Sequence, residues 1–223
     1  MIYEDIESTC EYNICLRGDN FYKETLESSD IWLEWLKKRY ILTTFEEDFI
    51  LIKEIGRGSS SIVYLAESTE THVQYAAKCV EKSLLRKDKN FLNNLIQEIK
   101  VLFYLEHPSI IKLFYVYETS EYVYLILEYL PHEDLYNRIL QKKILSEEDC
   151  SRFAKNLLDV LDYMHSKHIV HRDLKLENII MTSDNDYNFK IVDFGLSYES
   201  EEYQNEICGS PGYIAPEILR RCN

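Results

Sequence analysis

A stretch in the second half of the chain gathers the side-chain types that proton transfer beside a bound phosphate requires. The sequence HRDLKLEN covers residues 171–178, and Asp193 follows fifteen residues after Asn178. Asp173 can serve as a general base and Lys175 as a cation for a phosphate. Asn178 and Asp193 offer the oxygen ligands that Mg2+ prefers, with phosphate oxygens completing its shell. The spacing therefore indicates chemistry on a metal-bound phosphate.

A glycine- and serine-rich turn lies between two apolar segments, at residues 56–61, with the sequence GRGSSS. Glycines allow close approach of the backbone to a ligand, and successive N–H groups in such a turn form an anion-binding concavity. A strand follows this turn, whereas a helix must follow the loop in Rossmann and Walker-type sites. Taken alone, the turn fits an ordinary hairpin better than a phosphate site. Both readings stay open on these residues.

One lysine and one glutamate each fall on the apolar face of an expected element, which suggests that they are partners. Lys78 lies in an otherwise apolar strand beside a small residue. Glu98 falls on the stripe formed by Phe91, Leu95 and Leu102 of an expected helix. A carboxylate that faces a core is costly unless a cation meets it, so we expect an ion pair between Lys78 and Glu98.

The elements that must position these residues follow from apolar periodicity. We expect strands at 49–55, 62–66, 73–80, 111–117, 122–129, 179–181 and 189–192, and helices at 88–106 and from Ser146, whose hydroxyl can cap it. Strands come first, with one helix among them, and helix dominates afterwards. This order indicates an α+β fold with a small sheet-rich lobe and a helical lobe, and ligands favour the cleft between two such bodies.

Composition narrows the class of protein. The 223 residues are 46% hydrophobic and carry a net charge of −14, which argues against a surface that neutralises nucleic acid or binds an anionic membrane through basic residues. The six cysteines form no CxxC pair, which favours a reducing compartment. No secretory signal and no apolar run long enough to span a bilayer is present. We expect a soluble, intracellular (cytoplasmic) protein.

The order of the motifs resembles that of the eukaryotic protein kinases. HRDLKLEN is followed by DFG at 193–195, GSP at 209–211 and APE at 215–217, and the similarity runs over roughly three quarters of the chain. Lys175 and the string GSPGY are similar to the serine/threonine type, and CGSPGYIAPEIL resembles the calcium/calmodulin-dependent-kinase-like group. The resemblance implies a two-lobed fold with a small antiparallel-sheet lobe, ATP and Mg2+ as cofactors, and protein substrates.

The resemblance also implies a role for each matching residue. Asp173 would be the catalytic base, Lys175 would steady the γ-phosphate, and Asn178 and Asp193 would hold Mg2+. The residues expected around ATP are Ile55, Gly56, Arg57, Gly58, Ser59, Ser60, Ser61, Ile62, Val63, Ala76, Lys78, Glu98, Glu128, Leu130, Asp134 and Ile180. Leu127 would occupy the gatekeeper position before the hinge. The activation segment would involve Arg172, Glu206 and Ser210.

Several positions depart from the family pattern or add to it. Ser61 replaces the third glycine of the loop and is still small. We hypothesise that Glu206 supplies a built-in anion for Arg172 where relatives carry a phosphothreonine; the alternative is a solvated acid in an acidic loop. Asp134 and Glu177 place carboxylates where basic residues upstream of a target hydroxyl would bind; the alternative is contact with ribose or solvent only.

The two ends of the chain raise separate expectations. The family has further helices after the APE motif, and the chain stops six residues past Glu217. We therefore expect residues 48–223 to be a C-terminally truncated kinase domain that lacks its last helices, and the helix from Ser146 to show uncovered apolar surface. An alternative function follows: a catalytically inactive fragment that binds nucleotide or a partner.

Residues 1–47 form an acidic N-terminal segment with 11 acids and 5 bases. The segment loosely resembles the tail of a pleckstrin-homology domain, with Trp32 and Trp35 on a final helix, and a lipid-binding adaptor acting through it is a third reading. The alternative is a kinase-flanking segment that packs on the small lobe.

Overall fold

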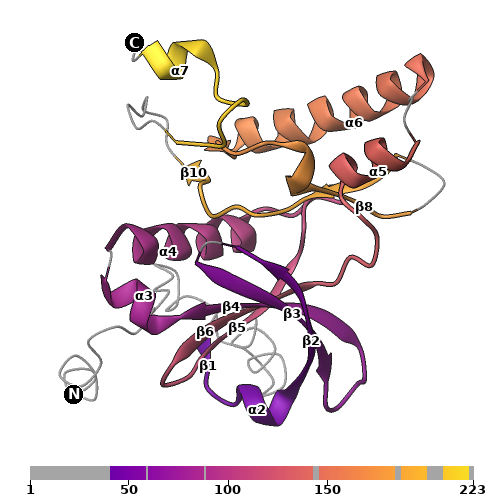
Figure 1. The fold of residues 1–223 in the computed structure, drawn as a ribbon. Helices are drawn as coiled ribbons and strands as arrows, with labels where there is room; N and C mark the ends of the chain where they lie inside the picture. The colour runs from indigo at the N-terminus through magenta and orange to yellow at the C-terminus, as the bar shows by residue number, and fades with distance from the viewer. Residues whose placement is uncertain are drawn as a thin grey trace, which may run out of the picture.

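The computed structural model describes residues 41–58, 60–87, 89–142, 146–183, 187–199 and 208–220. Two bodies are stacked in the order that the sequence predicts, with a sheet-rich lobe below a mostly helical lobe (Figure 1). The expectations for residues 1–40, Ser59 and Glu206 lie outside the described residues. Among the described helices, none is both long and apolar enough to cross a membrane.

The small lobe is a six-stranded sheet with helices on both faces. Its elements are β1 (Ile41–Leu42), α2 (Phe45–Asp48), β2 (Phe49–Arg57), β3 (Ser61–Ser68), β4 (Gln74–Glu81), α3 (Lys82–Lys87), α4 (Lys89–Tyr104), β5 (Leu113–Glu118) and β6 (Tyr122–Glu128). The strand order is β1-β5-β6-β4-β3-β2. All neighbours pair antiparallel except β1 with β5, which are parallel. The predicted strands are confirmed to within two residues at each end.

Strand β6 shows why this sheet can be covered on both faces. Its side chains alternate between two faces, as in any strand. Val123 and Leu125 enter the main core between the sheet and α4, while Tyr124 and Ile126 enter a second cluster on the opposite face. Phe45 of α2 stacks on Tyr124 in that cluster, with ring centroids 3.8 Å apart. Both faces of β6 are therefore apolar, and the strand lacks the alternation of apolar and polar residues that a sheet with one solvent-exposed face would show.

Helix α4 differs in part from its prediction. The helix expected over 88–106 is α4, and the short helix α3 that precedes it was not predicted. The inward stripe of α4 begins one turn later than predicted. Leu95, Glu98 and Leu102 are buried, whereas Phe91, in the first turn of α4, is 38% exposed. Ile99 completes the buried face of the helix. The helical period therefore predicted the buried face of α4 from Leu95 onward.

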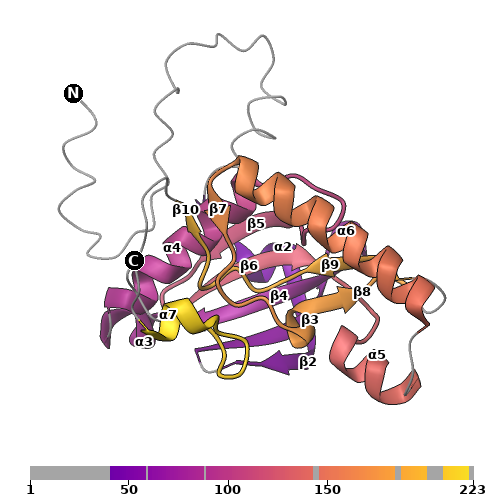
Figure 2. The same cartoon turned by 90° about the horizontal axis from the view of Figure 1, so that it is seen from above.

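The larger lobe contains α5 (Leu135–Lys142), α6 (Glu147–Ser166), β7 (Ile169–Val170), η1 (Leu176–Asn178), β8 (Ile179–Met181), β9 (Phe189–Ile191), β10 (Tyr198–Glu199) and α7 (Pro216–Arg220). Ser146 caps α6 as predicted, because its Oγ accepts a hydrogen bond from the Asp149 N–H at 3.1 Å. On α6, Met164 is fully buried and Leu157 and Leu161 are partly buried, whereas Leu158 is 66% exposed. Seen from above, β7 and β10 lie beside α4 (Figure 2).

Residues 41–48 pack onto the small lobe. The parallel pairing of β1 extends the sheet past β5, with Ile41 opposite Val116. The hydroxyl of Tyr117 donates to Asp48 Oδ2 at 2.8 Å, and the Thr69 hydroxyl donates to the Glu47 carbonyl at 2.7 Å. These bonds hold α2 over the aromatic cluster, so the last part of the predicted acidic segment is structurally joined to the sheet.

Candidate active site

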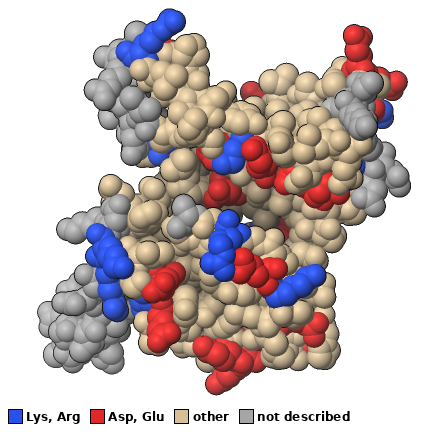
Figure 3. Space-filling model, viewed as in Figure 1, with Lys and Arg blue, Asp and Glu red and all other residues tan. Residues whose placement is uncertain are grey.

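An ion-paired group of three residues joins the sheet, the helix and the large lobe at the cleft between the lobes. Lys78 of β4 places Nζ 2.6 and 2.9 Å from the two carboxylate oxygens of Glu98 on α4. The same Nζ lies 3.3 Å from Oδ1 of Asp193, which follows β9. The predicted ion pair is confirmed. Figure 3 shows a hollow between the lobes with acidic and basic side chains at its rim.

Burial separates the roles of these three groups. The side chains of Lys78 and Glu98 are 14% and 4% exposed, whereas that of Asp193 is 50% exposed. Burial would lower the pKa of Lys78, but the carboxylates of Glu98 and Asp193 outweigh it and raise that pKa. Burial also opposes ionisation of Asp193, yet Lys78 holds its pKa below the usual range. The group thus keeps a cation and an open carboxylate side by side.

A second group forms around Asp173, in the loop between β7 and η1. Lys175 Nζ donates to Asp173 Oδ2 at 2.9 Å and to the Ser210 hydroxyl at 2.9 Å. The backbone N–H of Ser210 donates to Asp173 Oδ1 at 2.7 Å. Asn178 Nδ2 donates to the Asp173 carbonyl at 2.9 Å. Residues from the loop and from the segment before α7 therefore fix both carboxylate oxygens of Asp173.

These hydrogen bonds set the ionisation of the loop. Partial burial would raise the pKa of Asp173, but hydrogen bonds from Lys175 and Ser210 lower it below the usual value. The hydrogen bond to Asp173 likewise raises the pKa of Lys175. At neutral pH the pair is a carboxylate beside an ammonium ion, which suits a base that must accept a proton near negative charge.

His171 anchors the loop that contains Asp173 through both of its ring nitrogens. Its Nδ1 accepts the Asp173 backbone N–H at 3.2 Å, so Nε2 carries the proton and donates to the Val192 carbonyl at 3.1 Å. The ring also lies 4.9 Å from that of Phe194, which is fully buried. Burial lowers the pKa of His171. The neutral tautomer therefore ties the Asp173 loop to the backbone just before Asp193.

Among the described residues, two of the four residues other than glycine that have a positive φ lie at this site. Arg172 and Asp193 adopt φ values of 64° and 60°, a region that residues other than glycine rarely occupy. Gly209 has a φ of 110°, and a Cβ there would lie 2.8 Å from the Arg172 carbonyl oxygen. The Arg172 side chain donates to the Leu196 carbonyl. Such strain persists only where surrounding contacts hold it, which is typical of functional sites.

The glycine-rich turn lies in the hairpin that connects β2 and β3, as predicted. Gly56 pairs with Val63, and the Gly58 N–H donates to the Ser61 carbonyl at 2.8 Å. Arg57 forms an exposed ion pair with Glu54 at 2.6 Å. The flanks Ile55 and Ile62 and the turn residue Ser60 belong to the same hairpin. The hairpin lies next to β4, so its turn is adjacent to the strand that carries Lys78.

The residues expected around adenine line the inner face of the sheet and the strand below it. Val63 is opposite Lys78, and Ala76 is opposite Leu127 near the end of β6. Glu128 is the last residue of β6, and Leu130 follows in the connection to the large lobe. Ile180 on β8 forms a bridge with Asp134, at the beginning of α5. Strand pairing therefore brings Val63, Ala76 and Lys78 together on neighbouring strands, whereas the Glu128 carboxylate is paired with Lys190 of β9 at 3.0 Å.

Asp134 has a structural role that the sequence analysis missed. Its Oδ1 accepts the Asn137 N–H at 2.8 Å and its Oδ2 accepts from Asn137 Nδ2 at 2.9 Å. This geometry is that of a helix N-cap, at the start of α5, a helix that was not predicted. The Asp-x-x-Asn spacing was the available signal. Glu177 accepts a long bond from the Tyr213 hydroxyl at 3.5 Å.

The donor set at the cleft fits a magnesium-bound triphosphate. The Asn178 amide nitrogen is used by Asp173, which leaves its carbonyl oxygen as the ligand atom, and the Asp193 carboxylate is half exposed. A Cβ on Gly195 would lie 3.4 Å from Asp193 Oδ1, so this glycine keeps the approach to that carboxylate open. No cluster of three or more His, Cys, Asp or Glu side chains that could hold a metal occurs among the described residues. Two protein oxygens plus phosphate oxygens match how Mg2+ is usually held beside nucleotides.

Comparison with known proteins agrees with this arrangement. The model of the protein kinase domain matches residues 49–223. Calcium/calmodulin-dependent protein kinase type IV of Rattus norvegicus is 40% identical over 196 residues, which cover 86% of this chain and 39% of that protein. Myosin light chain kinase A of Dictyostelium discoideum is 38% identical over 181 residues, which cover 80% of this chain and 61% of that protein.

A third relative has a similar relation to the chain. Calcium/calmodulin-dependent protein kinase type 1 of Macrobrachium nipponense is 41% identical over 177 residues, covering 78% of this chain and 50% of that protein. The chain thus spans 39% to 61% of the lengths of these three relatives. The match of the kinase-domain model covers well over half of the chain and includes both groups of residues at the cleft. The chain belongs to the protein kinase family.

Proposed function

We propose that this protein is a serine/threonine protein kinase that transfers the γ-phosphoryl group of ATP to a hydroxyl group of a protein substrate. One observation carries the proposal: the Asp173 carboxylate is oriented by Lys175 and Ser210 in the same cleft that contains Lys78 paired with Glu98. A base and a phosphate-binding cation within one cleft are the parts that phosphoryl transfer to a hydroxyl requires.

Binding of ATP would use the two faces of the cleft. The hairpin with Gly56 and Gly58 would cover the phosphates, and Ala76 with Val63 would contact adenine. Lys78, held in place by Glu98, would pair with phosphate oxygens, since its positive charge is secured by the two carboxylates. Asn178 and Asp193 would hold Mg2+, which when bound neutralises charge on the phosphates.

The transfer step follows from the position of Asp173. A substrate hydroxyl donates its proton to the Asp173 carboxylate as its oxygen bonds to the γ-phosphorus, while the bond from that phosphorus to the β,γ-bridging oxygen breaks and ADP leaves. Lys175 lies beside Asp173 and would stabilise charge on the group in transit. Ser210, hydrogen-bonded to both residues, would fix the segment that receives the substrate.

We further propose that substrates with basic residues upstream of the target hydroxyl are favoured. Glu177 lies in η1, directly after the loop that contains Asp173, and among the described residues its carboxylate has one long hydrogen bond, from the Tyr213 hydroxyl. Both carboxylate oxygens of Asp134 are engaged by Asn137, so Glu177 is expected to contribute more of the preference. Complementary charge mainly affects specificity and association rate.

Phosphoacceptor peptides test this function. The 223-residue chain is incubated with Mg2+ and γ-labelled ATP and with three peptides that differ only in a central Ser, Thr or Tyr, each flanked upstream by Arg. We expect label on Ser and Thr and none on Tyr. Replacing the upstream Arg by Ala is expected to reduce kcat/KM severalfold in the parent and less in Glu177→Gln.

Two results would reject the proposal in different ways. Label on Tyr alone would reject the serine/threonine assignment. ATP-dependent thermal stabilisation without label on any peptide would favour the alternative function, a nucleotide-binding kinase fragment without transfer activity. Equal use of the Arg and Ala peptides by the parent would reject only the basic-substrate preference.

A further inference from the structure

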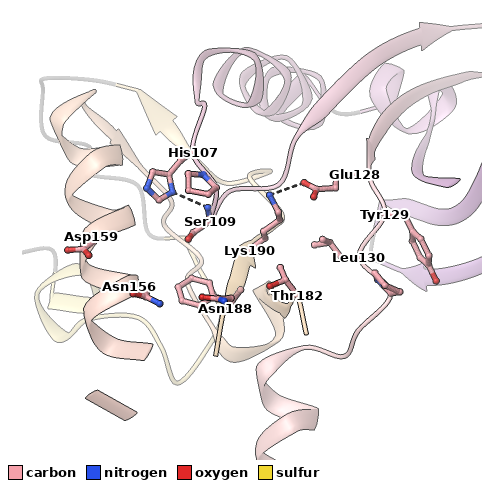
Figure 4. A pocket seen from close by; sticks show the side chains of 13 residues that line it. His107, Ser109, Glu128, Tyr129, Leu130, Asn156, Asp159, Thr182, Asn188 and Lys190 are labelled. Atoms are coloured by element: carbon pink, nitrogen blue, oxygen red, sulfur yellow. Dashed lines mark hydrogen bonds and ion pairs between the residues drawn. The ribbon is translucent and has the colours of Figure 1, made fainter. Parts of the chain in front are cut away.

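A second pocket lies at the hinge, and most of its residues are outside the catalytic set. It has a volume of about 660 Å³ and is lined by His107–Ser109, Glu128–Pro131, Asn156, Asp159, Thr182 and Asn188–Lys190 (Figure 4). We call this the rear pocket. It shares only Glu128 and Leu130 with the residues assigned to ATP. Its walls come from the loop after α4, the hinge, α6 and the β8–β9 hairpin, so both lobes contribute to it.

The charge of the rear pocket excludes an anionic ligand. Its one lysine, Lys190, places Nζ 3.0 Å from Glu128 Oε2 and 3.3 Å from the Ile110 carbonyl oxygen. The Lys190 charge is therefore already neutralised. Burial, together with the charge of Lys190, lowers the pKa of His107, so its imidazole is neutral at pH 7. Among the lining residues, the exposed Asp159 is a carboxylate without an ion-pair partner in the described part of the chain, and its charge acts on His107.

The polar groups of the rear pocket suit a peptide chain. Asn156 and Asp159 face it from consecutive turns of α6, and neither has a hydrogen-bond or ion-pair partner within the described part of the chain. A side-chain amide can pair with both groups of a peptide unit, and the Thr182 hydroxyl adds a further donor and acceptor. Pro131 and other apolar residues supply the rest of the wall. A volume of this size admits only a short segment.

We propose that the rear pocket binds a short, extended, cationic segment of a partner protein, with a basic side chain of that segment paired to Asp159. The amides and hydroxyl would hold the peptide backbone, and charge complementarity would select the basic residue. The segment would touch the hinge and both lobes at once. Binding here does not depend on phosphoryl transfer, so a failure of either proposal leaves the other standing.

Fluorescence anisotropy with designed peptides tests the proposal. The probe is a labelled peptide of Ala, Pro and Leu with one central Arg and no hydroxyl residue, so it cannot be phosphorylated. Its partner probe has Glu in place of Arg. We expect the Arg peptide to bind the full chain at least tenfold more tightly than the Glu peptide. Asp159→Asn is expected to weaken binding of the Arg peptide about fivefold, because a charge-assisted contact is lost.

Two further variants make the test specific. Asp162→Asn removes an exposed carboxylate from the same helix, outside the pocket lining, and is expected to leave the affinity unchanged. Asn156→Asp adds a carboxylate to the pocket and is expected to tighten binding of the Arg peptide. Equal binding of the two peptides, or an unchanged affinity in both Asp159→Asn and Asn156→Asp, would overturn the proposal. Loss of binding in Glu177→Gln alone would place the peptide in the substrate groove and overturn it as well.

Discussion

At the residue scale, a neutral imidazole links the proposed base to the proposed metal ligand. His171 accepts from the Asp173 backbone and donates to Val192, the residue before Asp193. A doubly protonated imidazole could not accept the first of these bonds, because both its nitrogens would be donors. The charge state of one buried ring thus sets the geometry of the loop that contains Asp173.

The stability of the protein is expected to fall on acidification through His171. Its folded-state pKa is below the usual value of 6.5, so the folded protein binds fewer protons there than the unfolded chain. This contribution is complete above pH 6.5 and is lost as the pH falls below 6.5 towards the folded-state pKa. Urea unfolding at several pH values between 7.5 and 5 measures it.

His171→Asn removes the titrating group and keeps a donor and an acceptor. We expect the free energy of unfolding to depend less steeply on pH in this variant than in the parent over that interval. An equal slope in the two proteins would show that His171 does not titrate on unfolding. NMR titration of the His171 ring in the parent gives an independent reading, and a pKa above 6.5 would contradict the structural account of its burial.

At the element scale, a buried ion pair joins β4 to α4. Lys78 and Glu98 form a polar link between the sheet and the helix, and the pair costs desolvation energy that its mutual attraction must offset. Removing one partner leaves a buried charge, whereas removing both does not. Its main value is therefore the position it gives Lys78 at the cleft.

A double-mutant cycle tests this view of the pair. Glu98→Leu is expected to lower the free energy of unfolding by about 3 kcal/mol, because Lys78 is left buried with Asp193 as its remaining partner. Lys78→Met combined with Glu98→Leu is expected to be more stable than Glu98→Leu alone. The exposed pair Arg57 and Glu54 is the control and is expected to show far weaker coupling, because solvent screens exposed charges. Additive effects at Lys78 and Glu98 would contradict the assignment.

Helix α2 covers the outer face of the sheet through a single aromatic side chain. Phe45 is 3% exposed and stacks on Tyr124, so Phe45→Ala is expected to lower the free energy of unfolding by about 3 kcal/mol. Phe91 on α4 is a matched control, because it is 38% exposed and Phe91→Ala is expected to cost far less. Urea denaturation compares the two. Equal losses would mean that α2 does not pack on the sheet in solution.

Sequence periodicity predicted the long elements and missed the ones that depend on contacts between distant residues. Strands such as β6 were found because apolar residues fill them from end to end. The two residues of β1 carry no period and form a strand only because β5 offers a free edge. Helix α5 was missed because Asp134 was interpreted through the family as a ligand-binding acid, and its capping of Asn137 was not considered.

At the site, too, features set by local sequence were predictable, and those set by contacts between distant residues were not. Glu98 was identified because a carboxylate on an apolar stripe needs a cation, a rule that applies to sequence alone. The contact of Ser210 with Asp173 closes a loop of 37 residues, and no local pattern states which oxygen the Ser210 N–H will meet. Local chemistry was therefore predictable, and the hydrogen bonds between separate segments required the fold.

At the scale of the whole molecule, each lobe contributes different residues to the cleft. The small lobe supplies the glycine turn and Lys78, and the large lobe supplies Asp173, Asn178 and Asp193. The lobes also meet at the ion pair of Lys78 with Asp193 and where Ile110, after α4, forms a bridge with Ile191 of β9. The proposed phosphoryl transfer would therefore require both lobes in register, and a partner at the rear pocket would touch both of them on the outer side of the hinge.

The role of Asp173 is tested most directly by comparing the full chain with Asp173→Asn in transfer of label from γ-labelled ATP to a serine peptide. ATP-dependent thermal shift is measured in parallel on both proteins. We predict that the parent transfers label, that Asp173→Asn is slower by about a thousandfold, and that the thermal shift is the same in both. Equal transfer rates would contradict a role for Asp173 as the base. Equal thermal shifts with no transfer by either protein would contradict kinase activity of the chain.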